Sequence, residues 1–390
     1  MRPYDLLLYG ATGFTGRQAA LYLAKHAPAD LKVALAGRSE SKLKAIAESC
    51  GRPVGIVVAD SSHPDSIDAM SACTRVLLST VGPYAQYGDP VVDACVRHQT
   101  HYADITGETP WVRRVIERHH QQAVESGVRI VPFSGFDSVP PDLGCWMMVQ
   151  AIRERYQVDV AEISSYCVLS GGFNGGTLAS ALGLVDETEM ENPKVLDVPG
   201  QSLPVVPPIS RVSWNDDFKA WTAPFFMTPV NAAVVRRSAG LFSASGRGYG
   251  PQFRYHEAWG SRSRLKALSL WLGVIGSTPI LKSSAGRWLA RRFGPAPGEG
   301  PSEATMDAGY FRYQFIAKTE DGRSLRGVFG DKGDPGNRVT VKCLCETGFA
   351  LTSVEVTPGA GGVLTPAFAL GKELLTRLQT AGMDIRVTDS

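Results

Sequence analysis

The chain has 390 residues, a formal net charge of +2, 44% hydrophobic residues and 20% charged ones. This composition excludes a disordered chain and a protein that binds nucleic acid through a large positive excess. The length predicts two domains, since a single core rarely grows beyond about 300 residues.

Neither a signal peptide nor an apolar run long enough to span a bilayer is evident in the sequence. The seven cysteines lack the spacing of metal ligands. We therefore expect reduced thiols, no metal site and a cytoplasmic location.

The first 140 residues alternate apolar runs with helical patterns, which is typical of parallel strands joined by helical crossovers. We predict an α/β fold class with a doubly wound Rossmann sheet over residues 1–140. The expected strands are 4–10, 31–38, 55–60, 75–82, 101–107 and 128–135.

The pattern changes after residue 140 to strand-like runs separated by connections rich in Pro and Gly. Runs at 160–170, 311–319 and 337–346 predict a mostly antiparallel sheet. We expect an inserted α+β domain over 141–350 that serves the substrate or an oligomer interface.

The C-terminal segment 351–390 contains a helical pattern over 365–382. We expect this C-terminal helix to pack back on the Rossmann domain.

Three glycines, Gly10, Gly13 and Gly16, separate the first expected strand from the first expected helix. In a dinucleotide fold such glycines permit a tight turn, the approach of a pyrophosphate and close helix packing. The helix N-terminus then offers unpaired N–H groups to the phosphates. A glycine-rich turn without ligand is the alternative. The residues assigned here to cofactor binding are Gly10, Thr12, Gly13, Phe14, Thr15 and Gly16.

The end of the second expected strand favours NADPH over NADH. An NAD enzyme usually has a carboxylate there, but this chain has Arg38 and Ser39, with Lys42 following. A guanidinium pairs well with a 2′-phosphate. Asp60, at the end of the third strand, is placed either to approach the adenine amine or to cap the next helix.

The fourth strand ends in Val81, Gly82 and Pro83, which we assign to the nicotinamide side of the cofactor site. Tyr84 and Tyr87 follow, and each phenol is a candidate to donate a proton or position a carbonyl. Aromatic packing is the alternative for both.

Two further loops lie at the same predicted edge. Asp137, after the sixth strand, is a third candidate catalytic residue, with Ser138 beside it. The loop 170–180, rich in glycine, is expected either to close over cofactor or substrate or to serve as a plain connection.

Several motifs together resemble the saccharopine dehydrogenase-like oxidoreductases, and most of all their trans-acting enoyl reductase branch. The motifs are GATGFTG, AGRSESKL, STVGPYAQYGDPVVDAC, YADITGE, GFDSVPPDLG, SGGFNGGTLAS and GGVLTPAFALGKELLTRL. The resemblance runs nearly end to end and implies a Rossmann domain, an inserted α+β domain and a nicotinamide cofactor.

The function expected from this resemblance is NADPH-dependent reduction of an enoyl thioester or a polyketide-derived lipid intermediate, with Tyr84 as the first candidate for proton donor. One alternative is a saccharopine-type imine reductase or amino-acid conjugate dehydrogenase. A second is a lipid-associated nucleotide-binding protein without catalysis.

The segment 269–292 bears on the substrate and partners. Its first thirteen residues carry no charge, and Lys282, Arg287, Arg291 and Arg292 follow. Such a segment suits a membrane interface or the mouth for a lipid tail, and a buried helix pair is the alternative. We expect a small-molecule or carrier-bound lipid substrate and no nucleic acid. Peripheral membrane contact and a homodimer are open hypotheses.

Overall fold

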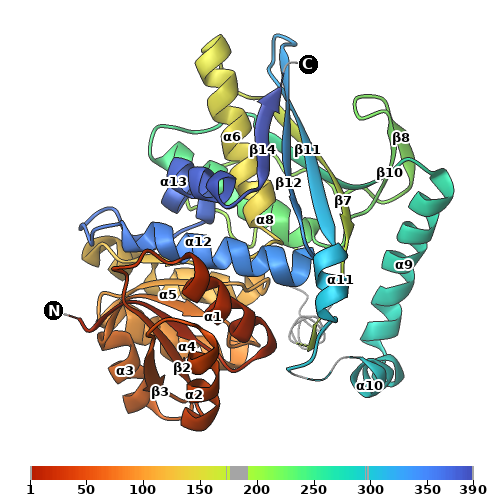
Figure 1. The fold of residues 1–390 in the computed structure, drawn as a ribbon. Coiled ribbons are helices and arrows are strands. Elements are labelled where there is room, and N and C mark those ends of the chain that lie inside the picture. The colour runs from red at the N-terminus through yellow and green to blue at the C-terminus, as the bar shows by residue number, and fades with distance from the viewer. Residues whose placement is uncertain (1, 173, 176–191, 295, 297, 389–390) are drawn as a thin grey trace.

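Two seven-stranded sheets form the molecule, and one long helix lies between them (Figure 1). The computed structural model describes residues 2–388 apart from 173, 176–191, 295 and 297. The loop predicted at 170–180 therefore falls largely outside the described residues, and its two alternatives stay predictions.

The first sheet is parallel, and its strand order is β13-β6-β5-β4-β1-β2-β3. The predicted doubly wound Rossmann sheet is confirmed, and the dinucleotide switch point falls between β1 and β4. Its strands are β1 (Tyr4–Tyr9), β2 (Val33–Gly37), β3 (Gly55–Val58), β4 (Thr74–Ser79), β5 (His101–Asp104), β6 (Arg129–Val131) and β13 (Gly362–Val363).

Helices cover both faces of this sheet because its strands are apolar on both sides. Leu6 and Leu8 of β1 belong to one core cluster, while Leu7 and Tyr9 belong to the other. The first face carries α1 (Phe14–His26), α2 (Glu40–Ser49) and α12 (Thr340–Thr352), and the second carries α3 (Pro64–Ala72), α4 (Tyr84–Arg97) and α5 (Thr109–Ser126).

The second sheet has the order β14-β12-β11-β7-β10-β9-β8. Only β7 and β10 pair in parallel, so the predicted mostly antiparallel sheet is confirmed. Its strands are β7 (Glu162–Ser170), β8 (Ser213–Asn215), β9 (Ala220–Ala223), β10 (Arg254–Ser261), β11 (Tyr310–Lys318), β12 (Ser324–Lys332) and β14 (Asp384–Thr388).

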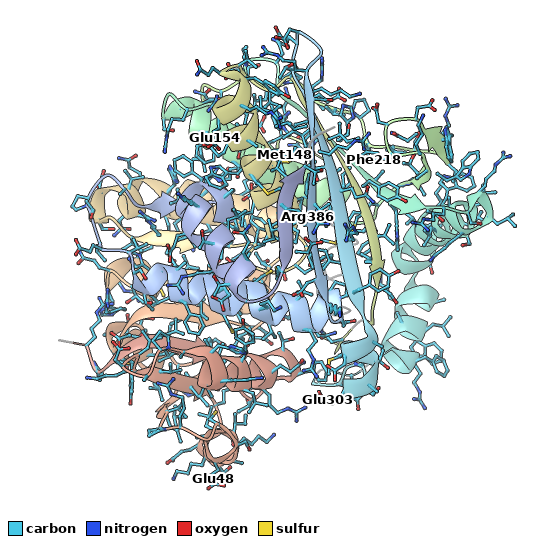
Figure 2. The ribbon with its side chains drawn as sticks, turned by 45° about the horizontal axis from the view of Figure 1, so that its top comes forward. Glu48, Met148, Glu154, Phe218, Glu303 and Arg386 are labelled. Carbon is cyan, nitrogen blue, oxygen red and sulfur yellow. The ribbon has the colours of Figure 1, made fainter. Side chains whose placement is uncertain are left out.

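Helices α6 (Val139–Tyr156) and α8 (Thr228–Ala244) pack on this sheet. Met148 of α6 lies where a side chain at Gly327 of β12 would sit, so the glycine allows close helix packing (Figure 2). Outside the sheet lie α9 (Arg264–Lys282), α10 (Ser284–Phe293) and α11 (Glu303–Ala308).

The predicted strand at 337–346 is wrong. Residues Pro335–Val339 form a π-helical turn, η2, and Thr340–Thr352 form α12. Gly348 allows α12 to sit directly on the first sheet, because a Cβ there would meet Leu78 and Leu6 at 2.8 and 3.1 Å.

The C-terminal segment connects the two sheets. β13 extends the first sheet and β14 forms the edge of the second. Between them, α13 (Pro366–Thr380) packs on α12 and α6 and touches β6. The predicted C-terminal helix is thus present, and it rests on the first sheet chiefly through α12.

Candidate nucleotide and active site

The glycine loop has the tight turn that its spacing predicts. Gly10 has φ +89° and lies close to Thr80 and Val81, since a Cβ there would stand 2.7 Å from each side chain. A Cβ at Gly16 would overlap the carbonyl oxygen of Gly10. Two of the three glycines are therefore required by packing.

Gly13 differs, because a Cβ there would meet only the Gly10 carbonyl oxygen, at 3.4 Å. Its place is at the N-cap of α1, and that helix has no acidic residue in its first turn. The first N–H groups of a helix lack intrahelical partners and favour anions. The open side of Gly13 therefore fits the pyrophosphate of a dinucleotide.

The other loop residues lie around this turn. Thr12 packs toward Gly37 at the end of β2, where a Cβ would be 3.6 Å from the Thr12 hydroxyl. Phe14 and Thr15 begin α1 and are partly buried.

The end of β2 presents an exposed Arg38 to solvent. Ser39 caps α2 by accepting a hydrogen bond from the Lys42 backbone N–H at 3.4 Å, and the Lys42 side chain is exposed. Arg38 and Lys42 thus bring two cations to the edge where a ribose 2′-phosphate would lie.

Asp60 follows β3, and its Oδ1 accepts hydrogen bonds from the Ser62 N–H and hydroxyl at 3.0 and 2.8 Å. These hydrogen bonds, with the nearby Arg38 charge, lower the pKa of Asp60. The carboxylate thus orders the turn before α3 but does not cap that helix, whose N-cap is His63, and the approach to the adenine amine stays a prediction.

The end of β4 approaches the same loop. Val81 lies against Gly10, and Gly82 and Pro83 lead from it into α4, with Gly82 exposed. These backbone positions stand at the switch point, where the nicotinamide half of a dinucleotide binds in this fold.

Tyr84 is buried in the first domain. Its hydroxyl donates to the Ser79 carbonyl at 3.1 Å and accepts from the Ile105 N–H at 3.4 Å, and its ring packs near Trp111. Burial raises its pKa well above the usual range. This bonding argues against Tyr84 as the proton donor. Tyr87, one turn on, is exposed.

The carboxyl end of β5 and the N-terminus of α4 are held by acids that have structural partners. Asp104 accepts from the Tyr102 hydroxyl at 2.8 Å and the Thr106 N–H at 3.0 Å. Glu108 accepts from the N–H groups of Tyr84 and Ala85, which caps α4. The carboxylates of Asp104 and Glu108 therefore both accept hydrogen bonds from the protein itself.

Asp137 differs from these acids. It follows β6 in a half-buried position, and within the described ranges no protein group donates a hydrogen bond to its carboxylate. Burial raises the pKa of Asp137 to about 6. A titratable group of this kind at the carboxyl end of a strand in a doubly wound sheet is a candidate for acid–base chemistry.

A buried polar cluster lies behind this edge, on the second sheet. Glu257 accepts hydrogen bonds from Asn231, Tyr313 and Tyr255 at 2.9, 3.0 and 3.2 Å. Burial raises the pKa of Glu257 to about 7. Asn231 also accepts from the Ser138 hydroxyl at 3.4 Å, so the cluster adjoins the loop that carries Asp137.

The second domain also touches the glycine loop. Gly300 lies against the Phe14 ring, and Arg338 of η2 donates to Gln18 Oε1 of α1 at 3.0 Å. Arg338 pairs as well with Asp307 and Glu303 of α11, and Figure 2 labels Glu303. We name Gln18, Glu303, Asp307 and Arg338 the clasp.

The loop at the end of β7 joins the clasp region. Asn174 Nδ2 donates to Asn337 at 2.7 Å, and the Gly172 N–H donates to the Asp334 carboxylate. These contacts are more than 160 residues apart in the sequence, so no local pattern could predict them. The sequence DPGN at 334–337 indicates a turn at this place but not its partners.

The described part of the chain holds no cluster of His, Cys, Asp and Glu able to bind a metal ion. Within the same ranges, no helix is long and apolar enough to cross a membrane. All seven cysteines are unpaired, and five of them are buried.

Known proteins resemble this chain along its length. A family model described as the saccharopine dehydrogenase NADP binding domain matches residues 6–131. A Mycobacterium tuberculosis protein named for the trans-acting enoyl reductases is 36% identical, over 99% of this chain and 98% of its own. The trans-acting enoyl reductase of Mycobacterium leprae is 32% identical over the same shares.

One solved structure matches the whole fold. The apo saccharopine dehydrogenase (L-Glu forming) of Saccharomyces cerevisiae superposes with a TM-score of 0.56 over 99% of this chain and 100% of that one, at 14% identity. At this identity the match concerns the fold alone.

Proposed function

This chain belongs to the saccharopine dehydrogenase-like family that includes the trans-acting enoyl reductases, and we propose from that premise that it reduces the carbon–carbon double bond of an enoyl thioester. Membership of this family confirms the prediction from the sequence that the protein is an NADPH-dependent oxidoreductase. The observation that carries the reaction class is 36% identity over 99% of the chain.

The residues of the glycine loop fit the cofactor. We propose that Gly10, Gly13 and Gly16, with the first N–H groups of α1, hold the pyrophosphate, and that Arg38 and Lys42 meet the 2′-phosphate. The clearance above Gly13 supports this assignment. NADPH, when bound, supplies the hydride that is added to the β-carbon, while the α-carbon takes a proton.

Asp137 is the proton donor that we propose for the α-carbon. Its carboxylate has no hydrogen-bond donor among the described protein groups, and its pKa of about 6 keeps a protonated fraction near neutral pH. Tyr84 is withdrawn from this role because its proton is bonded to Ser79. Tyr87 stays a candidate to position the thioester carbonyl.

The substrate that we propose is an apolar acyl chain, held on a carrier or another thiol. A saccharopine-type substrate carries several carboxylates and would need free arginines. Arg237 instead donates to the Leu196 and Val363 carbonyls, and Arg236 pairs with Asp197 at 2.6 Å. Both guanidinium groups are therefore occupied by contacts within the protein and are not available to bind substrate carboxylates.

The test is NADPH oxidation by the purified protein with enoyl thioesters of increasing chain length. NADH runs in parallel, and a second panel contains an amino acid with a keto acid. We expect turnover that requires NADPH and rises with chain length. Turnover only with the amine and keto acid would replace this proposal by the saccharopine-type reaction. The sequence-based homodimer and peripheral membrane contact stay predictions.

A further inference from the structure

Helices α9 and α10 stand apart from the body of the molecule. Figure 1 shows α9 running along the outer side of the second sheet and α10 folded beneath it, away from the Rossmann domain. Within the described part of the chain, α9 packs on β9, β10 and α10. We name Arg264–Phe293 the arm.

Large apolar side chains of the arm face solvent. Leu265, Leu272 and Ile275 recur at spacings of seven and three residues, which places them on one face of α9. The exposed fractions are 78% for Leu265, 60% for Leu272, 48% for Ile275, 62% for Trp288, 47% for Leu289 and 76% for Phe293. Isolated exposed apolar residues are ordinary, but this concentration marks an interaction surface.

The charge of the same segment has one sign. Residues 264–293 contain six of the chain's 40 Lys and Arg residues and none of its 38 Asp and Glu residues. The chain as a whole is nearly neutral, at +2. Arg264, Lys266 and Arg292 are exposed beside the apolar residues, so any partner of the arm meets positive charge and apolar surface together.

We infer that the arm docks on an anionic lipid surface. Helices that lie in a membrane interface combine exposed Leu, Trp and Phe with cations that meet anionic headgroups. An arm-to-arm contact with a second copy would bring like charges together, which disfavours that occupant. This inference rests on the proposed function and adds an anionic lipid surface as the partner of the enzyme. The arm contains none of the residues assigned to cofactor binding, so the two proposals can be tested separately.

Vesicle co-sedimentation tests the inference. We expect the full chain to pellet with vesicles of phosphatidylcholine mixed with phosphatidylglycerol, and far less with phosphatidylcholine alone or in high salt. Trp288→Ala with Phe293→Ala should weaken partition about tenfold or more, because two large apolar anchors are lost. Arg264→Glu with Arg292→Glu should remove the preference for the anionic lipid.

Matched variants elsewhere on the surface serve as controls. Leu21→Ala with Val58→Ala removes exposed apolar side chains, and Lys25→Glu with Lys372→Glu reverses two exposed cations. Neither pair should change partition. NADPH binding and turnover of a short, water-soluble enoyl thioester should be equal in all variants, so a failure of the enzymatic proposal is seen separately.

Two results would overturn the inference. One is partition of the arm variants equal to that of the wild type. The other is absence of vesicle binding together with a dimer in solution that the Trp288→Ala, Phe293→Ala variant dissociates, which would make the arm an interface between copies.

Discussion

Gly13 and Gly16 are glycines for different reasons: Gly16 is required by packing, whereas Gly13 leaves room for the proposed ligand. A Cβ at Gly13 meets only one oxygen at 3.4 Å, whereas a Cβ at Gly16 overlaps the Gly10 carbonyl. We expect Gly13→Ala to fold with a stability within about 0.5 kcal/mol of the wild type, and to bind NADPH at least about tenfold more weakly because the methyl group faces the pyrophosphate.

Fluorescence titration with NADPH and urea unfolding measure the two effects. Gly16→Ala is the matched comparison, since it should lose stability as well as binding. Wild-type affinity in Gly13→Ala would show that no phosphate lies at this turn.

Arg38 decides between the two nicotinamide cofactors. Its side chain is exposed at the end of β2, where an NAD enzyme has a carboxylate. Replacing a charge-assisted contact costs about 1.5–3 kcal/mol, so Arg38→Glu should weaken NADPH binding about 10- to 100-fold and improve NADH binding. Dissociation constants for both cofactors check this, with Lys44→Glu as an exposed control. Parallel losses for NADH and NADPH would contradict it.

Asp137 links catalysis to pH. Its folded pKa of about 6 lies above the reference value of 3.8, so the native state holds a proton that the unfolded chain releases between these values. Stability contributed by that proton is lost as pH rises from about 4 to 6. Asp137→Asn should therefore unfold like the wild type at pH 4 but resist urea better at pH 8, by at most about 3 kcal/mol.

The same substitution should lower kcat with an enoyl thioester by about 10²- to 10⁴-fold and remove the decline of kcat above pH 6 that a required carboxylic acid predicts. Asp65→Asn, exposed on α3, is the control. A variant with wild-type kcat at every pH would remove Asp137 from the mechanism.

Among the elements, α12 shows why sequence pattern predicts only part of the fold. The letters at 337–346 are rich in Val, Thr and Cys, which favour strands. In the structure almost every residue from Thr340 to Leu351 is buried, because the helix is enclosed by the first sheet and by α13. A helix that is buried on all sides has no polar face, so its sequence lacks the amphipathic period of 3.6 residues that identifies a helix.

Asp142 stabilises the junction of three helices. Its carboxylate lies on α6, accepts from the Ala367 N–H of α13 at 2.8 Å and accepts from Ser238 of α8. Asp142→Ala leaves the buried Ala367 N–H unpaired and leaves the Ser238 hydroxyl with Thr365 as its partner, so we expect a loss of about 1–3 kcal/mol in the free energy of unfolding. Asp142→Asn keeps an acceptor and should lose less.

Urea unfolding of both variants checks this, with Asp65→Ala as an exposed control. Equal stability of Asp142→Ala and the wild type would mean that the cap contributes nothing to the junction.

At the scale of the whole molecule, the sequence predicts the fold of each domain better than the contacts between the two domains. The Rossmann half follows from apolar runs and from Gly10, Gly13 and Gly16, all of which are local signals. The clasp joins Gln18 to Arg338 across 320 residues, and outside the clasp Gly300 lies against the ring of Phe14. Such contacts depend on the packed arrangement of both sheets. Asp137 is a candidate from the sequence, but the choice between Asp137 and Tyr84 needs the hydrogen-bond partners of Tyr84, which only the structure gives.

The clasp predicts that nucleotide binding and domain contact are coupled. Arg338 donates to Gln18, which lies four residues after Phe14 in α1, the helix whose N-terminus we propose to face the pyrophosphate. Its ion pairs with Glu303 and Asp307 are partly exposed, so Arg338→Ala should cost only about 1 kcal/mol without ligand. The rise in Tm on adding NADPH should shrink, because the ligand then orders a helix that the second domain no longer holds.

Thermal unfolding with and without NADPH measures this, and Gln18→Ala closes a double-mutant cycle with an expected coupling of about 0.5–1.5 kcal/mol. Arg323→Ala removes a similar exposed ion pair, with Asp321, that lies away from α1 and serves as the control. Additive effects of Arg338→Ala and Gln18→Ala, with an unchanged NADPH shift, would show that the second domain covers the glycine loop without influencing it. A coupling of the expected size would make the inserted domain part of the nucleotide site.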